Sequence, residues 1–222
     1  MSGEALNSLM LSLKVAAVAT VFVSAIGIAA AYFLARRSFR GKEVLDSLLT
    51  LPLVLPPTVT GYYLVLLLGR RGFLGGPLYE SLGLSLMFTW QGAAVAAFVV
   101  SLPLMIKITR SAIESVDENL ISVSSTLGHS ELRTALKVIL PLSLKGIAAG
   151  AALSFARALG EFGATLMIAG NIPGKTDTMP LAIYTKASSG DWAGANAMVA
   201  VFTLMSFGFL LAANRFFKRA TA

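Results

Sequence analysis

The sequence predicts an all-α fold, a polytopic transmembrane helical bundle. Of its 222 residues, 56% are hydrophobic and only 13% are charged, whereas roughly a quarter of the residues in a soluble globular domain are charged. The mean hydropathy is +0.77, and the apolar residues form runs of about 20, the length at which a helix crosses a bilayer. Each run is predicted to be helical, because an open strand edge would leave backbone groups unsatisfied in lipid.

Five spans are predicted within a single transmembrane domain of residues 1–222. The apolar runs lie at about 8–35, 44–68, 84–106, 146–168 and 196–214. Each is long enough to cross roughly 30 Å of hydrocarbon at about 1.5 Å per residue. The first run is interpreted as a retained helix and not as a secretory signal, because its Lys and Arg cluster follows the apolar stretch. Lys14, near the outer end of this helix, is expected to snorkel to the interface.

The distribution of basic residues predicts the orientation. Twelve Lys and Arg residues are cytoplasmic if the segments 36–43, 107–145 and 215–222 lie on that side. The opposite side keeps four, which are Arg70, Arg71, Lys175 and Lys186. This bias satisfies the positive-inside rule with the N-terminus outside and the C-terminus cytoplasmic. The net charge of +7 is therefore interpreted as a topology signal and not as a nucleic-acid-binding patch.

Prolines interrupt the second predicted span. Pro52, Pro56 and Pro57 each remove a backbone donor, so a broken or kinked helix is expected. Irregular backbone at membrane depth is tolerated where it is packed in protein or lines a cavity. Two interpretations therefore stay open, an ordinary kink for packing and a pore lining. The residues that the second interpretation places on a translocation path are Pro56, Pro57, Thr58, Thr60 and Gly61, together with Asn171 as a further neutral donor.

The longest polar stretch, residues 107–145, is predicted to contain two short amphipathic helices. Apolar residues recur there at helical spacing around Gly128, with Ser130 as the expected cap of the second helix: Leu120, Val123, Leu127, Leu132, Leu136 and Ile139. Such helices bury their apolar face on their own membrane domain, on the lipid surface or in a partner's groove. The spacing alone does not choose among these three.

The fourth predicted span carries a charged pair and a small-residue motif. Arg157 and Glu161 stand one helical turn apart, which is close enough to pair. They form either a structural ion pair or part of the gate or anion path. Gly146 and Gly150 form a GxxxG motif, which allows helices to approach closely within the chain or across a dimer contact.

Enzymatic chemistry and metal binding are not expected from this chain. It has no Cys and a single His, His129, which excludes disulfides, thiolate metal sites and His clusters. Gly174, Lys175 and Thr176 suggest the end of a phosphate-binding loop, but position 169 is Ala where that motif requires Gly. No catalytic residues, no metal and no cofactor are therefore predicted for the chain itself. The segment 169–195 is interpreted as a surface for an extracytoplasmic binding protein.

The polar stretch also resembles a known sequence pattern. Ser124-Ser125-Thr126-Leu127-Gly128, nine further residues and Val138-Ile139-Leu140-Pro141 resemble the cytoplasmic coupling loop of ABC-importer permeases, whose pattern is Glu-Ala-Ala, three residues, Gly, nine residues, a β-branched residue, any residue and Leu-Pro. The resemblance implies a type I importer fold in which this segment docks on an ATPase subunit. The implied docking residues are Ser122, Val123, Ser124, Thr126, Leu127, Gly128, His129, Leu140 and Pro141. Ser122, Val123 and Ser124 replace Glu-Ala-Ala, so no salt bridge from a Glu at 122 is expected.

Further segments indicate the substrate. Residues 51–62, 67–72, 160–165 and 168–176 resemble molybdate permeases, and sulfate permeases share much of the later pattern, often with Tyr in place of Phe162. The resemblance implies import of molybdate across the cytoplasmic (inner) membrane, with tungstate and sulfate as alternatives. It also implies two partner ATPase subunits that bind ATP-Mg, and an oxyanion-binding protein outside. A homodimer is expected, because five helices are few to enclose a pore and a two-fold dimer supplies ten.

Two other classes of protein stay open. A stand-alone channel or secondary transporter would be expected to show a repeated half or membrane-embedded charge relays. The sequence has one charged pair and no clear repeat. A membrane-embedded hydrolase would need a nucleophile and a base close together, and His129 is predicted to lie in the cytoplasm.

Overall fold

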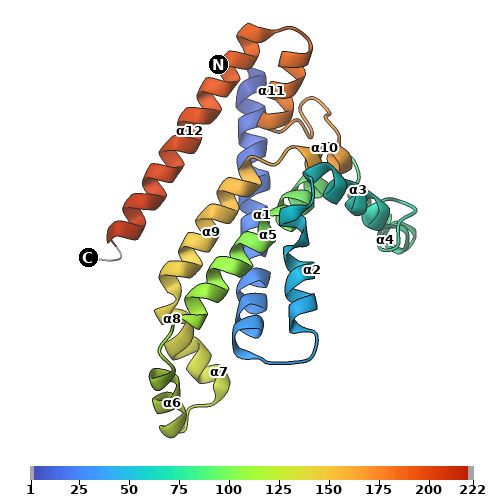
Figure 1. Cartoon of the computed structure of the whole chain (residues 1–222). Coiled ribbons are helices and arrows are strands. Elements are labelled where there is room, and N and C mark those ends of the chain that lie inside the picture. The colour runs from blue at the N-terminus through green and yellow to red at the C-terminus, as the bar shows by residue number, and fades with distance from the viewer. Residues whose placement is uncertain (1–2, 220–222) are drawn as a thin grey trace.

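The computed structural model describes the backbone of residues 3–219. It describes the side chains of the same residues, except those of 214 and 216–219. Every described element is helical (Figure 1). In chain order the helices are α1 (Gly3–Arg36), α2 (Lys42–Val54), α3 (Pro57–Leu68), α4 (Gly75–Leu82), α5 (Trp90–Glu114), α6 (Glu118–Thr126), α7 (Glu131–Thr134), the π-helix η1 (Ala135–Ile139), α8 (Leu140–Leu142), α9 (Leu144–Leu159), α10 (Gly163–Ala169), α11 (Met179–Ser188) and α12 (Trp192–Arg219).

Three of these helices are long and apolar enough to cross a membrane on their own. They are α1, α5 and α12, the last over Trp192–Ala213. Two bent pairs also have the required length and composition, α2 with α3 and Glu131–Leu142 with α9. By length and composition, the described part of the chain therefore has three helices that could each span a membrane, or up to five candidate spans if each bent pair counts as one.

The second predicted span, 44–68, is not one continuous helix. It consists of α2 and α3, and the chain bends by 116° between them. Leu55 donates the last backbone hydrogen bond of α2, and Pro56 and Pro57 follow without N–H groups to continue it. The expectation of a broken helix at these prolines is confirmed.

Two other predicted boundaries need correction. The span expected at 84–106 begins at Trp90, because Thr89 is an N-cap whose hydroxyl accepts the Gly92 N–H at 3.1 Å. It then continues to Glu114, into the stretch that was expected to lie outside the membrane. The span expected at 146–168 ends as α9 at Leu159, and α10 is a separate helix that begins at Gly163.

The core forms where α1, α5 and α9 pack against one another. Its central side chains are small, and Ala16, Ala93 and Ala97 are fully buried. Small residues let helices approach closely, which replaces the hydrophobic driving force that is absent between helices in lipid. The GxxxG motif contributes to the same packing, since a Cβ atom on Gly146 would collide with Ala112 of α5. Its contact within the chain is therefore confirmed.

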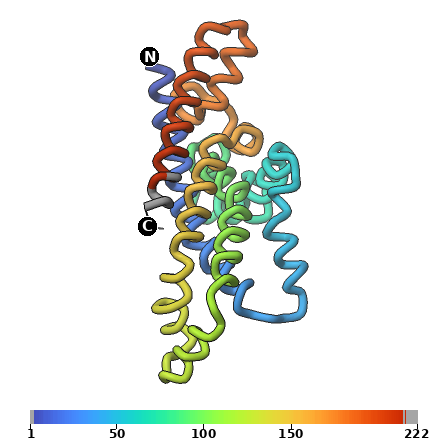
Figure 2. The backbone as a smooth tube through the Cα atoms, turned by 60° about the vertical axis from the view of Figure 1, so that its left-hand side comes forward, coloured from blue at the N-terminus to red at the C-terminus, as the bar shows by residue number. Residues whose placement is uncertain are grey.

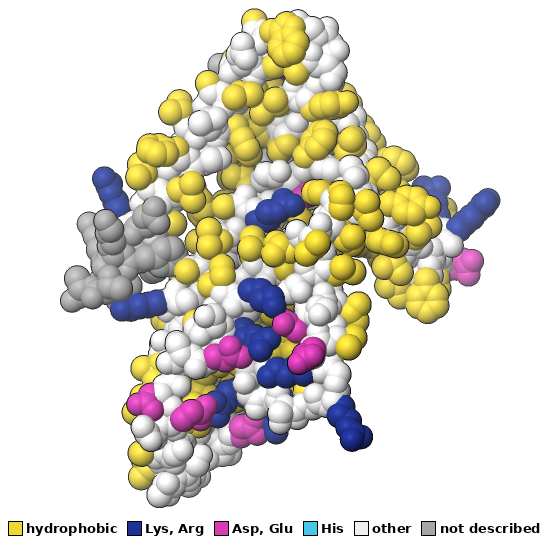
Figure 3. All heavy atoms as spheres, viewed as in Figure 1, with side chains coloured by type: hydrophobic (Ala, Val, Ile, Leu, Met, Phe, Trp, Pro, Cys, Tyr) yellow, Lys and Arg dark blue, Asp and Glu magenta, His cyan; other side chains and the backbone are white. Residues whose placement is uncertain are grey.

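The two ends of the molecule differ in character. In both views α6 and α7 lie at one end, and α11 and the N-terminus lie at the other (Figure 1, Figure 2). On the face shown in Figure 3, most Lys, Arg, Asp and Glu side chains gather toward the α6 end, while apolar side chains dominate the other half. Segments 36–43 and 107–145, both predicted to be cytoplasmic, share the α6 end. Of the other basic residues used for that prediction, the side chains of Lys218 and Arg219 lie outside the described residues.

Helix α11 was not expected from the sequence. It forms within the segment 169–195 and is tied to the first turns of α1. The hydroxyl of Ser12 accepts the Met179 N–H at 2.7 Å, and the hydroxyl of Ser8 donates to Asp177 at 3.1 Å. The predicted outer surface is therefore a folded cap on the N-terminal end of the bundle.

Candidate functional site

The segment between α5 and α9 folds as two short helices joined at a glycine, as predicted. Helix α6 ends at Thr126, Leu127 is its C-cap, and Gly128 follows with a φ of 78°. The Gly128 N–H donates to Ser125 O at 2.9 Å and the His129 N–H donates to Ser124 O at 3.2 Å, which is the hydrogen-bond pattern of a Schellman motif. The left-handed backbone at this turn explains why the position favours glycine.

The second helix starts where the sequence indicated. Ser130 is the N-cap of α7, and its hydroxyl accepts the Arg133 N–H at 3.4 Å. Inside the turn, the Ser124 hydroxyl lies 2.8 Å from the Thr134 hydroxyl and 3.1 Å from Nδ1 of His129. Both Ser124 and Thr134 are buried. Ser124 therefore fixes α6 to α7, and His129 contributes to the same internal contact.

The apolar side chains of this segment divide into a buried set and an exposed set. Ile139 is buried with Ile113 of α5 and Ile121 of α6. The other five are between 47% and 71% exposed; we call them the coupling face, and they are Leu120, Val123, Leu127, Leu132 and Leu136. Ser122, Thr126 and Pro141 are exposed as well, and Leu140 is half-buried. Of the three surfaces that could cover the apolar face, the chain's own membrane domain is thus excluded for these five residues.

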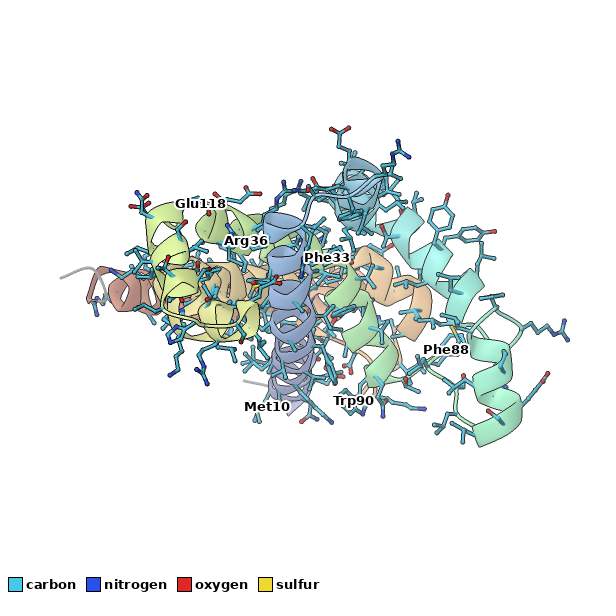
Figure 4. All side chains as sticks on the ribbon, turned by 90° about the horizontal axis from the view of Figure 1, so that it is seen from below. Met10, Phe33, Arg36, Phe88, Trp90 and Glu118 are labelled. Atoms are coloured by element: carbon cyan, nitrogen blue, oxygen red, sulfur yellow. The ribbon has the colours of Figure 1, made fainter. Side chains whose placement is uncertain are left out.

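Two ion pairs hold the segment against the end of α1. Arg36 donates to Glu118, in the first turn of α6 (Figure 4). Arg37 lies 2.8 Å from Glu131, in the first turn of α7. Carboxylates at helix N-termini are also stabilised by the helix dipole. Both short helices are therefore fixed to the same helix end by their own first turns.

A third group of charges joins α2 to α5. Asp46 of α2 accepts a hydrogen bond from Lys107 at 2.9 Å and lies 3.2 Å from Arg110. Arg110 also donates to Glu114 at 2.7 Å. Helix α2, which ends at the proline break, is thus connected to α5, which leads into α6. Sequence reasoning missed the ion pairs between helices, because nothing in the local pattern indicates which charges 61 to 94 residues apart will meet.

The residues around the proline break have different environments. Pro56, Pro57 and Thr58 are exposed, whereas Thr60 and Gly61 are buried. The hydroxyl of Thr60 has no hydrogen-bond partner among residues 3–219. The start of α3 therefore presents an open surface formed by the two prolines and Thr58.

Gly61 lies at the crossing of α3 and α10. A Cβ atom on Gly61 would lie 2.8 Å from Ala164 Cα and 2.7 Å from Met167 Cβ. On the other helix, a Cβ on Gly163 would lie 3.2 Å from the backbone nitrogen of Thr58. The two glycines therefore allow α3 and α10 to pack closely together. Each of these helices is one part of a predicted span that is broken in the structure.

Arg157 and Glu161 pair as the spacing predicted. Nη1 of Arg157 lies 2.8 Å from Oε2 of Glu161, although Glu161 lies beyond the end of α9. The other carboxylate oxygen accepts the N–H of Ala164 at 2.8 Å in the first turn of α10. The Glu161 side chain is 2% exposed and that of Arg157 is 29% exposed. The carboxylate thus joins the two helices on either side of the second break.

Asn171 lies apart from these residues, at the α11 end. Its side-chain nitrogen donates to Thr185 at 2.5 Å, while its side-chain oxygen is buried without a partner among the described residues. It lines a polar cavity of about 180 Å³ with Ser8, Asp177 and Lys186. None of residues 56–61 lines this cavity.

The same end carries an exposed ion pair between the last turn of α11 and the start of α12. Lys186 lies 3.1 Å from Asp191 and 3.4 Å from Glu4. The pKa of Asp191 is lowered, first by the hydrogen bond that its carboxylate accepts from the Gly194 N–H and then by Lys186. The turn between α11 and α12 is therefore stabilised by an ionised aspartate. Among residues 3–219, no group of three or more His, Cys, Asp or Glu residues could hold a metal ion.

Sequence comparison identifies relatives over most of the chain. Residues 10–221 match the family described as binding-protein-dependent transport system inner membrane component. The chain is 49% identical to the molybdenum transport system permease protein ModB of Escherichia coli (strain K12) over 179 residues, 81% of this chain and 78% of that protein. It is 36% identical to the sulfate transport system permease protein CysT of Salmonella typhimurium, over 91% of this chain and 73% of that protein.

The fold also matches solved structures. An inward-facing structure of the MetNI methionine ABC transporter superposes with a TM-score of 0.79 and 16% identity, with all of both chains covered. At this identity the match establishes the fold, which is that of type I ABC importer permeases. With the family match over residues 10–221 and the 49% identical relative, the chain belongs to the binding-protein-dependent transport system inner membrane components.

Proposed function

We propose that this chain is the membrane-spanning subunit of an ATP-driven importer of molybdate, and that it hydrolyses nothing itself. The observation that carries the proposal is the 49% identity to a molybdenum permease over 81% of the chain. The sulfate permease relative is less similar, at 36% identity. Molybdate is therefore the favoured substrate, with tungstate and sulfate as the alternatives.

The coupling face is the proposed docking surface for the ATPase. Its five apolar side chains lie on helices at the charged end of the molecule, and the chain itself leaves them exposed. Burying a fully exposed Leu or Val contributes about 1.5–3 kcal/mol, so a groove that covers them would bind strongly. Ser122, Thr126, Gly128 and Pro141 would lie at the same contact. Ser124 and His129 would act from within, by holding α6 against α7.

The translocation path is proposed to form between two copies of the chain. The exposed start of α3, with Pro56, Pro57 and Thr58, would face it. Thr60 and Gly61 would support this surface from behind, and Arg157 with Glu161 would hold the adjacent break. Asn171 would lie nearer the binding protein, which we place at the α11 end, outside the membrane. The N-terminus would then be outside and the C-terminus cytoplasmic, with two ATPase subunits below the dimer.

Reconstitution tests the proposal. The permease, its ATPase and its binding protein are incorporated into liposomes, and uptake and ATP hydrolysis are measured with molybdate, tungstate and sulfate. Uptake of molybdate that requires ATP and the binding protein is expected. Preferential uptake of sulfate would reassign the substrate, and anion movement by the permease alone would favour a secondary transporter.

A pair of matched variants tests the docking surface. Leu127→Ser on the coupling face and Leu82→Ser at the end of α4 remove side chains of similar exposure, 71% and 65%. Leu127→Ser is expected to weaken ATPase binding by about tenfold, from the lost burial of one side chain. Leu82→Ser should leave binding unchanged, and neither change should lower the melting temperature. Equal binding by the two variants would contradict the assignment.

A further inference from the structure

An apolar groove runs between α1 and α5. Its volume is about 430 Å³, and almost all of its surface is carbon. One wall consists of Val18, Phe22 and Ile26 of α1, and the other includes Trp90, Val95 and Phe98 of α5. Phe22 and Ile26 are 57% and 49% exposed, so no described part of the chain covers this wall.

The groove ends at a cation. Lys14 lies one helical turn before Val18, on the same face of α1 as the groove wall. Its ammonium group is 3.7 Å from the centroid of the Trp90 ring. Among residues 3–219, no carboxylate forms a salt bridge with Lys14.

The start of α5 adds positive potential at the same place. Trp90 is the first residue of α5, and Figure 4 shows it on the same side of the molecule as Met10 of α1. Thr89 caps the N–H of Gly92, while the N–H groups of Trp90 and Gln91 have no acceptor within the helix. The N-terminus of a helix of this length carries a partial positive charge. An anion at Lys14 would therefore lie beside a cation and near the positive end of a helix.

We propose that this groove binds an anionic phospholipid, with one acyl chain along Val18, Phe22 and Ile26 and the phosphate at Lys14. Lys14 and Ile26 are separated by about 18 Å along the helix axis, which is close to the depth of one bilayer leaflet. Trp and Lys side chains commonly lie at the boundary of a membrane, where Lys reaches toward the headgroups. Trp90 and Lys14 are therefore expected to lie at that boundary. The ligand would belong to the leaflet nearer the N-terminus, at the opposite end from the coupling face.

Native mass spectrometry of the assembled transporter tests the headgroup contact. The complex is equilibrated in nanodiscs of phosphatidylcholine with increasing phosphatidylglycerol, and the retained lipids are counted. A roughly fivefold preference for phosphatidylglycerol is expected, the factor that one basic residue contributes at an anionic surface. Lys14→Gln should abolish the preference, and Lys175→Gln, which changes an exposed lysine in the loop before α11, should preserve it. An unchanged preference in Lys14→Gln would overturn the proposal.

A second experiment identifies what occupies the groove. The chain has no Cys, so Phe22→Cys introduces a unique thiol that accepts a fluorophore. Quenching by phospholipids with a spin label on the acyl chain is expected, and quenching should rise when the labelled lipid is phosphatidylglycerol. Leu204→Cys on the exposed face of α12 is the control, at which the two headgroups should quench equally. A disulfide between two copies through position 22 would show that a second copy covers the groove, and would refute the lipid site.

Discussion

Substitutions of Gly128 separate backbone strain from contact with a partner. Gly128 has a φ of 78°, and nothing lies within 4 Å of the position that a Cβ atom would take. In the chain alone, the cost of Gly128→Ala is therefore only that of a left-handed L residue, about 1–2 kcal/mol. Gly128→Asn should cost less, because Asn adopts this conformation more readily. Free-chain stability should thus follow the order Gly, Asn, Ala.

Docking predicts a different order. Gly128 is exposed and follows Leu127 of the coupling face, so on the proposed docking a side chain there would enter the contact with the ATPase. Molybdate taken up per ATP hydrolysed should then fall with side-chain size, from Gly through Ala and Asn to Trp, with Gly128→Trp reduced at least tenfold. The same substitutions at Gly83, which has a φ of 66° and equally open surroundings at the end of α4, are the control. If uptake per ATP instead follows the stability order, or if Gly128→Trp transports as the wild type does, the docking argument fails.

Three other changes test separate parts of the structure. Arg37→Glu should reduce uptake per ATP, and the reversed pair with Glu131→Arg should restore it; the free energy of unfolding should change by less than about 1 kcal/mol, because the pair is exposed. Failure of the reversed pair would instead indicate that Glu131 contacts the ATPase directly. Gly61→Ala should destabilise the chain by about 1–3 kcal/mol, measured as a lower melting temperature, since the added Cβ would lie 2.8 Å from Ala164 Cα; an unchanged melting temperature would contradict the close crossing. Because the pKa of Asp191 is lowered, its ionised carboxylate stabilises the turn fully above the unfolded pKa of about 3.9. That stabilisation is lost as the pH falls through the pKa of Asp191 in the folded chain. Asp191→Asn should therefore speed hydrogen exchange in the α11–α12 turn at pH 7, and its difference from the wild type should shrink as falling pH protonates Asp191; a difference that does not shrink would contradict this cause.

The apolar runs predicted where the long helices lie better than they predicted whether each helix is continuous. Prolines marked the break between α2 and α3, because they remove the donors that a continuous helix needs. The break after α9 has no such signal. Gly160 stands in a stretch without proline, and the break is seen only in the structure, where the buried carboxylate of Glu161 accepts the N–H of Ala164 in the first turn of α10.

For residues 107–145, the helical spacing predicted an apolar face but not which of its side chains are buried. Leu136 and Ile139 have similar chemistry and are one turn apart, yet one is 57% exposed and the other is buried. The difference arises because Ile139 packs against Ile113 of α5, a contact that no local pattern specifies. The ion pairs of Arg36 and Arg37 are equally nonlocal, and they depend on where α1 happens to end relative to α6 and α7.

These nonlocal contacts determine which helices would move if the coupling face were displaced. Helix α6 follows α5 after a three-residue link, so α5 must move with it, and the ion pairs from Glu118 and Glu131 add α1. Asp46 then connects α5 to α2, whose far end is the proline break. Because the break lacks the hydrogen bonds that stiffen a helix, bending there costs less than bending within α2 or α3. On the proposed function, closure of the ATPase would therefore be transmitted through α5 and α2 and expressed as a change in angle at Pro56, beside the surface that faces the translocation path.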